Sequence, residues 1–388
     1  MIFKKKQVFA AACIGLLLFG VILITLGSIL PALRDKFKID ELNAGKLTLI
    51  LAFGILIGSL VFGPVADRRG YKILLVTTTL LVGLAFQGLA FAESWFLVQV
   101  CIFIIGFAGG IINGVTNAMV ADISTGDKGA NLSLLGVFFG IGALGMPLLL
   151  GILSKQFRYP VILSFTGLFM LLPIVYFIGI KFPVPKQSKG FPVKEGIKLI
   201  KEPILLLISF FLFFQSGTEA LVNNWITTFL QTELKSTQEN SLFILSCFVG
   251  GLTVARLLLG FILKKISSYN VMLASLLITA AGSMLLLYAG SSTIALIAMV
   301  IIGMGLAAGF PVMLGYTGQL YSNLSATAFS IALVIALIGN MLINYFFGFI
   351  SNNYGVSRLP VFLLAGIGCL FVILFFIRAR ISKIENIK

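Results

Sequence analysis

A single carboxylate interrupts one of the long apolar stretches of this sequence. Glu219 is the only charged residue in the run 204–230. Burying an ionised group in hydrocarbon is expensive, so an acid at such a position is a candidate functional residue. Burial disfavours the ionised form, which suits a group that loads and releases a proton. A carboxylate can also bind sodium or accept hydrogen bonds from solute hydroxyls, and the structural alternative is an acid that stays protonated or paired.

Polar side chains share the predicted helix with this acid. Residues four apart lie on one helix face, so Gln215, Glu219 and Asn223 form a polar stripe that could bind a polyhydroxylated solute, with Asn224 beside it. Trp225 lies roughly 140° from Asn223 on an ideal helix. It therefore either forms a neighbouring wall of the site or anchors the helix at the membrane interface.

Two further amide pairs have the same four-residue spacing. Asn113 and Asn117 lie in the run 95–121, and Asn340 and Asn344 lie in the run 327–349. Each pair could contact solute or could join helices, which is worth about 1 kcal/mol or less. We favour solute contact for the first pair and leave the second open.

Arg256 is the only cation that lies deep inside an apolar run and not at its ends. By helix rise it lies roughly 10 Å from the end of that run. Three roles stay open for it: pairing with Glu219, a gate, or snorkelling of the guanidinium to the membrane surface.

The composition sets the class of protein. Of 388 residues, 59% are hydrophobic and 11% are charged, with a mean hydropathy of +1.10, whereas soluble domains are about a quarter charged. The chain is therefore a polytopic membrane protein. The net charge of +15 comes from short loops between apolar runs, so a nucleic-acid partner is not expected.

Several kinds of chemistry are excluded by the residues present. The sequence has no histidine, and its four cysteines lie in apolar runs without metal or disulfide spacing. There is no phosphate-binding loop of the Walker type. We therefore expect neither an enzyme nor a bound metal or cofactor, and any proton that crosses must be carried by carboxylates.

Twelve apolar runs are long enough to span a bilayer, which takes about 20 residues each. We therefore predict an all-α membrane protein with two six-helix halves, residues 1–180 and 204–388, joined by a basic linker, 181–203. The predicted spans are 8–31, 44–66, 73–92, 95–121, 130–153, 159–180, 204–230, 240–263, 270–290, 293–315, 327–349 and 358–378.

Positive charge and internal similarity support this organisation. With the N-terminus inside, 19 Lys and Arg residues fall on the inner side and 8 on the outer side, which predicts cytoplasmic termini and linker in the plasma membrane. Residues 60–72 align with 257–269 at an offset of 197. The same offset pairs Ile22 with Glu219, so the acid belongs to the second half alone.

The residues Gly63-Pro-Val-Ala-Asp67-Arg68-Arg69-Gly70-Tyr-Lys resemble the loop signature G-x-x-x-D-R-x-G-x-[RK] of the major facilitator superfamily. The resemblance implies a transporter in which helices one, four, seven and ten line a central cavity. It also implies that Asp67 and Arg68 tie helix ends together and steady the outward-facing state. The alternative is a solvated basic turn.

Two glycine-rich runs bear on helix movement. The run Gly136 to Pro147 resembles the fifth helix of exporters in this family, but Met146 separates Gly145 from Pro147, so we interpret it as ordinary helix packing. In the tenth span, Gly303, Gly305, Gly309 and Pro311 form a composition suited to bending during alternating access.

A narrower pattern, Gly217-x-Glu219-x5-Trp225, is similar to the fucose permease and sodium-dependent glucose transporter branch of the family, although the acids of the first and fourth helices of fucose permease are absent here. We expect a monomeric symporter that takes up a small polar solute, most simply a sugar, with a proton or sodium ion. The alternatives are a proton-driven drug or metabolite exporter and a membrane sensor that does not transport.

Overall fold

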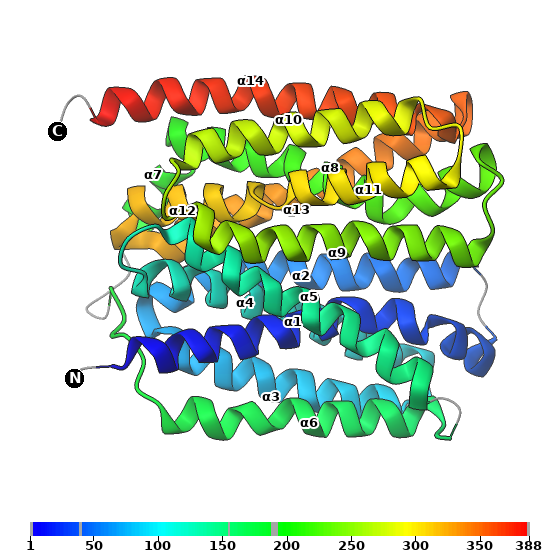
Figure 1. The fold of residues 1–388 in the computed structure, drawn as a ribbon. Coiled ribbons are helices and arrows are strands. Elements are labelled where there is room, and N and C mark those ends of the chain that lie inside the picture. Colours follow the sequence, from blue (N-terminus) through cyan, green and yellow to red (C-terminus); the bar gives the residue numbers. More distant parts are fainter. Residues whose placement is uncertain (1–2, 39–40, 154–155, 188–192, 386–388) are drawn as a thin grey trace. The chain divides into compact units, whose positions relative to one another are not determined.

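The computed structural model describes residues 3–38, 41–153, 156–187 and 193–385. Within these ranges every regular element is a helix (Figure 1), because an apolar segment in a bilayer must satisfy its backbone groups internally. Twelve helical stretches are long and apolar enough to cross a membrane, six before the linker and six after it. The prediction of an all-α protein with twelve spans is confirmed.

The helices are α1 (Lys5–Phe37), α2 (Glu41–Arg69), α3 (Tyr71–Ala90), α4 (Trp95–Ile123), α5 (Lys128–Leu153), α6 (Tyr159–Gly179), α7 (Val193–Leu199), α8 (Pro203–Glu233), α9 (Gln238–Ile262), α10 (Ser268–Leu287), α11 (Ser292–Leu306), α12 (Gly309–Leu320), η1 (Ser322–Leu324), α13 (Ser325–Tyr354), η2 (Val356–Arg358) and α14 (Leu359–Glu385).

The chain forms two compact units, and each contains a segment from the opposite half of the sequence. Unit 1 consists of Met1–Ile123, Phe138–Gly196 and Tyr321–Ser330, and unit 2 consists of Ser124–Val137, Ile197–Leu320 and Ile331–Lys388. The first turns of α13 thus pack in unit 1, and the first turns of α5 pack in unit 2. The proposed boundaries of the two sequence halves stay a prediction.

Unit 1 is held together mainly by α4, on which α1, α2 and α3 pack, and by α6, which packs on α3. Close backbone approach makes this packing possible. At Gly54 of α2, an added Cβ would lie 2.6 Å from the carbonyl oxygen of Phe103 in α4, which is closer than a real side chain allows. Small residues of this kind let membrane helices meet through backbone contacts.

Unit 2 contains a broken helix. In it α11 packs on α9 and α10, and α14 packs on α8 and α10. The tenth predicted span is one apolar stretch, Ser292–Leu320, but α11 ends at Leu306 and α12 begins at Gly309. The interruption lies among the glycines that predicted a bend, because glycine and proline weaken a helix locally.

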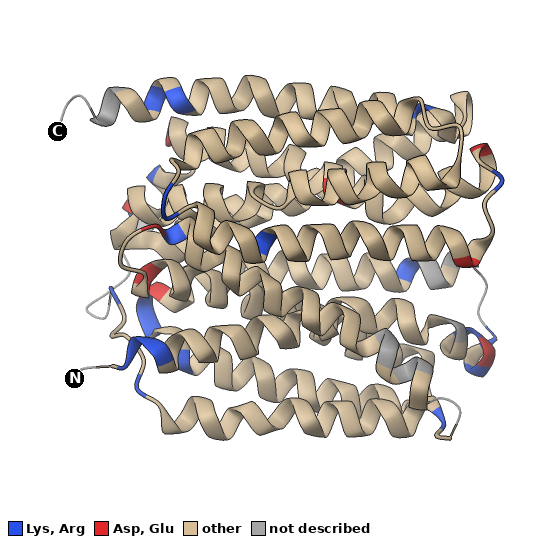
Figure 2. Cartoon of the chain, viewed as in Figure 1, with Lys and Arg blue, Asp and Glu red and all other residues tan. Residues whose placement is uncertain are grey.

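The helix ends follow local sequence signals. The hydroxyls of Thr237, Ser267 and Ser291 accept hydrogen bonds from backbone N–H groups at the starts of α9, α10 and α11, as N-caps do. Gly70 separates α2 from α3 with a φ of 83°, a conformation that suits glycine. Charged residues are found mainly toward the helix ends (Figure 2).

Candidate functional site

Glu219 lies on α8 of unit 2 and is half-buried as a whole. Its Oε2 atom is buried and has no hydrogen-bond partner among the residues that the structure describes. A buried acceptor without a donor costs about 1–3 kcal/mol, and more when it is charged. The free Oε2 atom can therefore bind a proton, a cation or a hydroxyl group.

Arg256 of α9 is the cation whose charge acts on Glu219. Its side chain is only 8% exposed, and its Nε atom is buried without a partner. The two described side chains form no direct ion pair. Their attraction therefore acts through space, and each group keeps hydrogen-bonding capacity that the protein does not use.

The first turns of α5 hold Arg256 in place. The hydroxyl of Ser133 donates a hydrogen bond of 2.7 Å to the carbonyl oxygen of Arg256. A Cβ added at Gly136 would lie 3.0 Å from Cδ and 3.3 Å from Nε and Nη1 of the arginine. The guanidinium thus lies directly on the helix backbone at Gly136, where any side chain would crowd it. The snorkelling alternative does not describe this buried conformation.

Gln215, one helical turn before Glu219, contacts the broken helix. It is 1% exposed, and its amide Nε2 donates a hydrogen bond of 2.9 Å to the carbonyl oxygen of Leu306. That carbonyl belongs to the last residue of α11, where the break removes its helical partner. In this structure Gln215 therefore bridges α8 to the interruption between α11 and α12.

Replacing Gln215 by leucine is expected to lower stability by about 1–3 kcal/mol, because the Leu306 carbonyl would be left buried without a donor. Thermal unfolding of the purified protein in detergent measures this as a lower midpoint. T218V is the matched control, since the Thr218 hydroxyl donates only within α8, to Phe214. Equal midpoints for Q215L and T218V would show that the bridge does not contribute.

The remaining polar residues of α8 point to a second, more exposed position. Asn223 and Asn224 are both exposed; Asn223 donates to the backbone of Glu219, whereas Asn224 donates to Oδ1 of Asn344 in α13 at 3.0 Å. Asn344 donates in turn to the Asn340 carbonyl. Asn224, Asn344 and Asn340, which the sequence placed in two separate spans, therefore form one chain of hydrogen bonds across α8 and α13.

Trp225 packs against an aromatic side chain of α13. Its half-buried ring meets Phe347 of α13 edge to face, with ring centroids 5.1 Å apart. Such a contact is typical of aromatic pairs in cores and at interfaces. This contact holds α8 against α13 near the amide chain. Helix packing is thus a third role for Trp225, beside the site wall and the interfacial anchor that the sequence suggested.

Asn113 and Asn117 of α4 belong to unit 1, and both are half-buried. Asn117 donates to the backbone carbonyl of Asn113 at 2.8 Å and to its side-chain oxygen at 3.1 Å. Their remaining hydrogen-bonding capacity is consistent with a solute contact. That these amides face the stripe on α8 stays a prediction.

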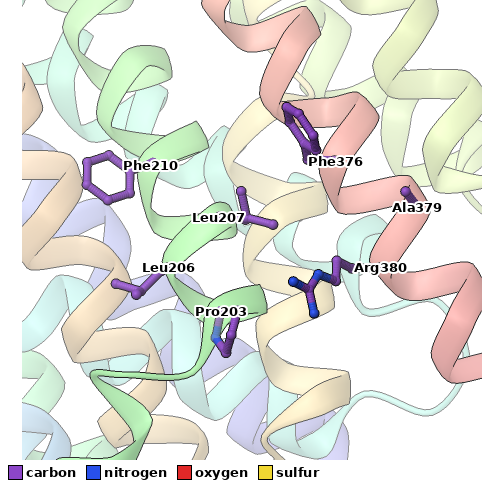
Figure 3. A pocket seen from close by; sticks show the side chains of 7 residues that line it. All are labelled: Pro203, Leu206, Leu207, Phe210, Phe376, Ala379 and Arg380. Atoms are coloured by element: carbon purple, nitrogen blue, oxygen red, sulfur yellow. The ribbon is translucent and has the colours of Figure 1, made fainter.

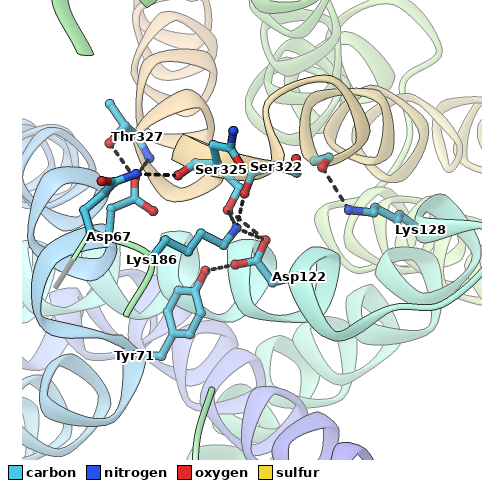
Figure 4. A network of polar contacts seen from close by, with 11 residues as sticks. Asp67, Tyr71, Asp122, Lys128, Lys186, Ser322, Ser325 and Thr327 are labelled. Carbon is cyan, nitrogen blue, oxygen red and sulfur yellow. Dashed lines mark hydrogen bonds and ion pairs between the residues drawn. The ribbon is translucent and has the colours of Figure 1, made fainter. Parts of the chain in front are cut away.

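A second polar cluster lies in unit 1 at the end of α2 (Figure 4). Asp67 is 2% exposed, and its Oδ2 accepts hydrogen bonds from the backbone N–H of Thr327 at 2.9 Å and from its hydroxyl at 2.7 Å. Thr327 is the third residue of α13, where backbone N–H groups lack helical partners. A carboxylate from α2 thus caps the start of α13 and complements its helix dipole.

Close packing accompanies this cap. A Cβ added at Gly63 would lie 2.7 Å from the carbonyl oxygen of Ala326 and 2.7 Å from Cβ of Ser330, so a side chain at position 63 would separate α2 from α13. The Ser330 hydroxyl donates to the carbonyl oxygen of Ser59. Gly63, Asp67 and Gly70 therefore all have a structural reason to keep their identity.

The sequence did not reveal four further members of this cluster. Lys186 of the linker forms an ion pair of 2.7 Å with Asp122 at the end of α4, and it also donates to Oγ of Ser325 at 2.6 Å. Tyr71 donates to the other oxygen of Asp122. Lys186 could be counted from sequence only as one basic residue of the linker, and nothing in its spacing indicated a partner.

Three other predicted residues have simpler placements. Arg68 is exposed and forms no hydrogen bond or ion pair with another residue in the described ranges, so the tie between helix ends falls to Asp67 and Lys186 in this structure. Pro311 is buried in the first turn of α12, directly after the break. Pro147 lies in α5, and its side chain is outside the described part of the chain.

The sequence matches one protein family and several of its transporters. A family model described as Major Facilitator Superfamily matches residues 12–270 and 208–388. The glucose/mannose transporter GlcP of Bacillus subtilis (strain 168) is 24% identical over 355 residues, which cover 86% of this chain and 85% of GlcP. The sodium-dependent glucose transporter 1A of Mus musculus is 23% identical over 379 residues, which cover 87% of this chain and 88% of that protein.

The chain is also similar to an efflux pump over part of its length and to a solved transporter structure over nearly all of it. A multi-drug resistance efflux pump PmrA homolog of Lactococcus lactis is 27% identical over 229 residues, or 56% of each chain. The crystal structure of FucP in the outward conformation aligns with a TM-score of 0.80 at 20% identity, covering 96% of this chain and 98% of FucP. At that identity the likeness establishes the fold.

Proposed function

The chain belongs to the Major Facilitator Superfamily, and on this basis we propose that it takes up a small polar solute, most simply a sugar, together with a proton or a sodium ion. Membership of the family makes it a transporter and an integral multi-pass membrane protein. Direction, solute and coupling ion are the proposal, as are a monomeric state, a plasma-membrane location and cytoplasmic termini.

One observation carries the coupling part of the proposal. The Oε2 atom of Glu219 is buried and has no hydrogen-bond donor among the described residues, and Arg256 is the cation whose charge acts on this carboxylate. A carboxylate in this position is the natural place for a proton or a cation to bind inside the membrane.

The solute class rests on chemistry and on relatives. Amide side chains offer both donors and acceptors, as sugar hydroxyl groups require, and Asn223, Asn224 and Asn344 provide them on α8 and α13. Two relatives that match most of this chain are described as glucose transporters. These observations together favour a hexose or a similar polyol.

Uptake into vesicles tests the proposal. The purified protein would be reconstituted into liposomes and given radiolabelled hexoses under an inward proton gradient, an inward sodium gradient, or none. We expect accumulation of at least one sugar with one of the two gradients, and only equilibration without a gradient. Failure of every sugar to accumulate with either ion would overturn the proposal.

An exporter is the second candidate. It is favoured by the partial match to a drug efflux pump and by the glycine-rich stretch of α5, where Gly136 lies against Arg256. In the same liposomes, an exporter would drive apolar dyes out of the compartment in exchange for protons that enter down their gradient, and it would leave sugars unmoved. That pattern of transport would replace uptake with export.

A further inference from the structure

A groove of about 600 Å³ lies between the beginning of α8 and the end of α14 in unit 2 (Figure 3). Pro203 begins the span Pro203–Glu233, and Arg380 lies near the end of the span Val356–Ser382. The groove therefore opens where the apolar layer of a membrane meets the lipid headgroups. Both spans end here on the side of the molecule that positive charge predicts to be cytoplasmic.

The long walls of the groove are apolar. Leu206, Leu207 and Phe210 line it from α8, and Phe376 and Ala379 line it from α14. Phe210 and Phe376 are 47% and 52% exposed. From Pro203 to Phe210 the helix rises about 10 Å, so the apolar surface extends from the headgroup level into the hydrocarbon layer, with the small side chain of Ala379 leaving room between the helices.

The mouth of the groove is positively charged. Arg380 points into it (Figure 3) and forms no hydrogen bond or ion pair with any residue of the described chain. Lys198, Lys201 and Arg378 lie in the neighbouring segments, and Glu195 and Glu202, the acids of those segments whose side chains the structure describes, do not line the groove. A guanidinium without a protein partner matches the two acceptor oxygens of a phosphate group.

We propose that this groove binds one anionic phospholipid, with its phosphate on Arg380 and an acyl chain along Phe210 and Phe376. The groove opens toward the lipid, so membrane lipids can enter it, and the positive charge of Arg380 favours anionic lipids. Basic pockets between membrane helices on the cytoplasmic side select anionic headgroups by this combination. The proposal does not depend on which solute the protein transports.

Native mass spectrometry of the full-length protein in detergent tests the site, with titrated dioleoylphosphatidylglycerol compared with dioleoylphosphatidylcholine. We expect tighter binding of the first phosphatidylglycerol than of phosphatidylcholine. R380Q should weaken phosphatidylglycerol binding roughly fivefold, from about 1 kcal/mol for each basic residue near a membrane surface. A379W, which fills the groove and keeps the charge, should reduce binding of both lipids.

R378Q is the matched control. Arg378 has the same charge and lies two residues away, but it stacks over Tyr269 at 5.1 Å and does not line the groove. R378Q should therefore weaken phosphatidylglycerol binding less than R380Q does. If R380Q and R378Q lost equal phosphatidylglycerol affinity, binding would depend only on the overall positive charge of this surface, and the proposed site would be refuted. A dimer in the wild-type spectrum that A379W abolishes would assign the groove to a second copy instead.

Discussion

Replacing Glu219 by glutamine is expected to abolish gradient-driven accumulation of solute while leaving exchange of solute across the membrane. A membrane potential of 100 mV is worth about 2.3 kcal/mol for each charge moved, which corresponds to roughly 50-fold accumulation of a neutral solute carried with one cation. Glutamine keeps the size of the side chain but cannot bind the ion. The accumulation ratio of E219Q should therefore fall to about 1, the value of an uncoupled carrier, as measured by uptake of labelled solute into liposomes.

The control for this prediction is E233Q. Glu233 ends the same helix but is exposed, so the identical change there should leave accumulation intact. Exchange is measured separately, by loading vesicles with labelled solute and adding unlabelled solute outside. A variant E219Q that still accumulates solute like wild type would exclude Glu219 from coupling.

Replacing Asp67 by asparagine should have the second largest effect. The wild-type carboxylate accepts two hydrogen bonds from Thr327, and hydrogen bonds to charged groups are worth about 1.5–3 kcal/mol each. Asparagine removes the charge at the start of α13 and presents an amide that can only partly replace the acceptor. We expect a loss of about 2–4 kcal/mol, seen as a lower thermal midpoint, with a transport rate reduced at least about tenfold.

Two companion variants separate the cap from general charge effects. T327V removes the hydroxyl donor but keeps the backbone donor, so it should cost about 1.5–3 kcal/mol, and combining it with D67N should add little further loss. R68Q changes an exposed neighbour and should be nearly neutral for stability. A midpoint for R68Q as low as that for D67N would refute the capping role.

The fold could be predicted from sequence because the membrane leaves few choices. Each run of about 20 apolar residues must form a helix to satisfy its backbone, and the twelve spans followed from that rule. Helix ends were less certain. The predicted second span stopped at residue 66, whereas α2 continues to Arg69, because polar residues remain helical at the headgroup level until Gly70 turns the chain.

The site was only partly predictable. Glu219 could be recognised because burying a charge in hydrocarbon is costly, and this cost can be judged without knowing which residues lie beside it. Gln215 could not be assigned to the Leu306 carbonyl, since helical periodicity gives its face but not its neighbour. The same limit hid the ion pair of Lys186 with Asp122, whose two residues are 64 positions apart and meet only after folding.

The most direct test of coupling through Glu219 is the ion flux that solute itself evokes. Liposomes would contain a pH-sensitive or sodium-sensitive dye, and solute would be added with no ion gradient imposed. Wild type and E233Q should both show ion entry that begins with solute addition, and E219Q should show none while still exchanging solute. Solute-evoked ion entry in E219Q equal to that of wild type would contradict coupling at this carboxylate.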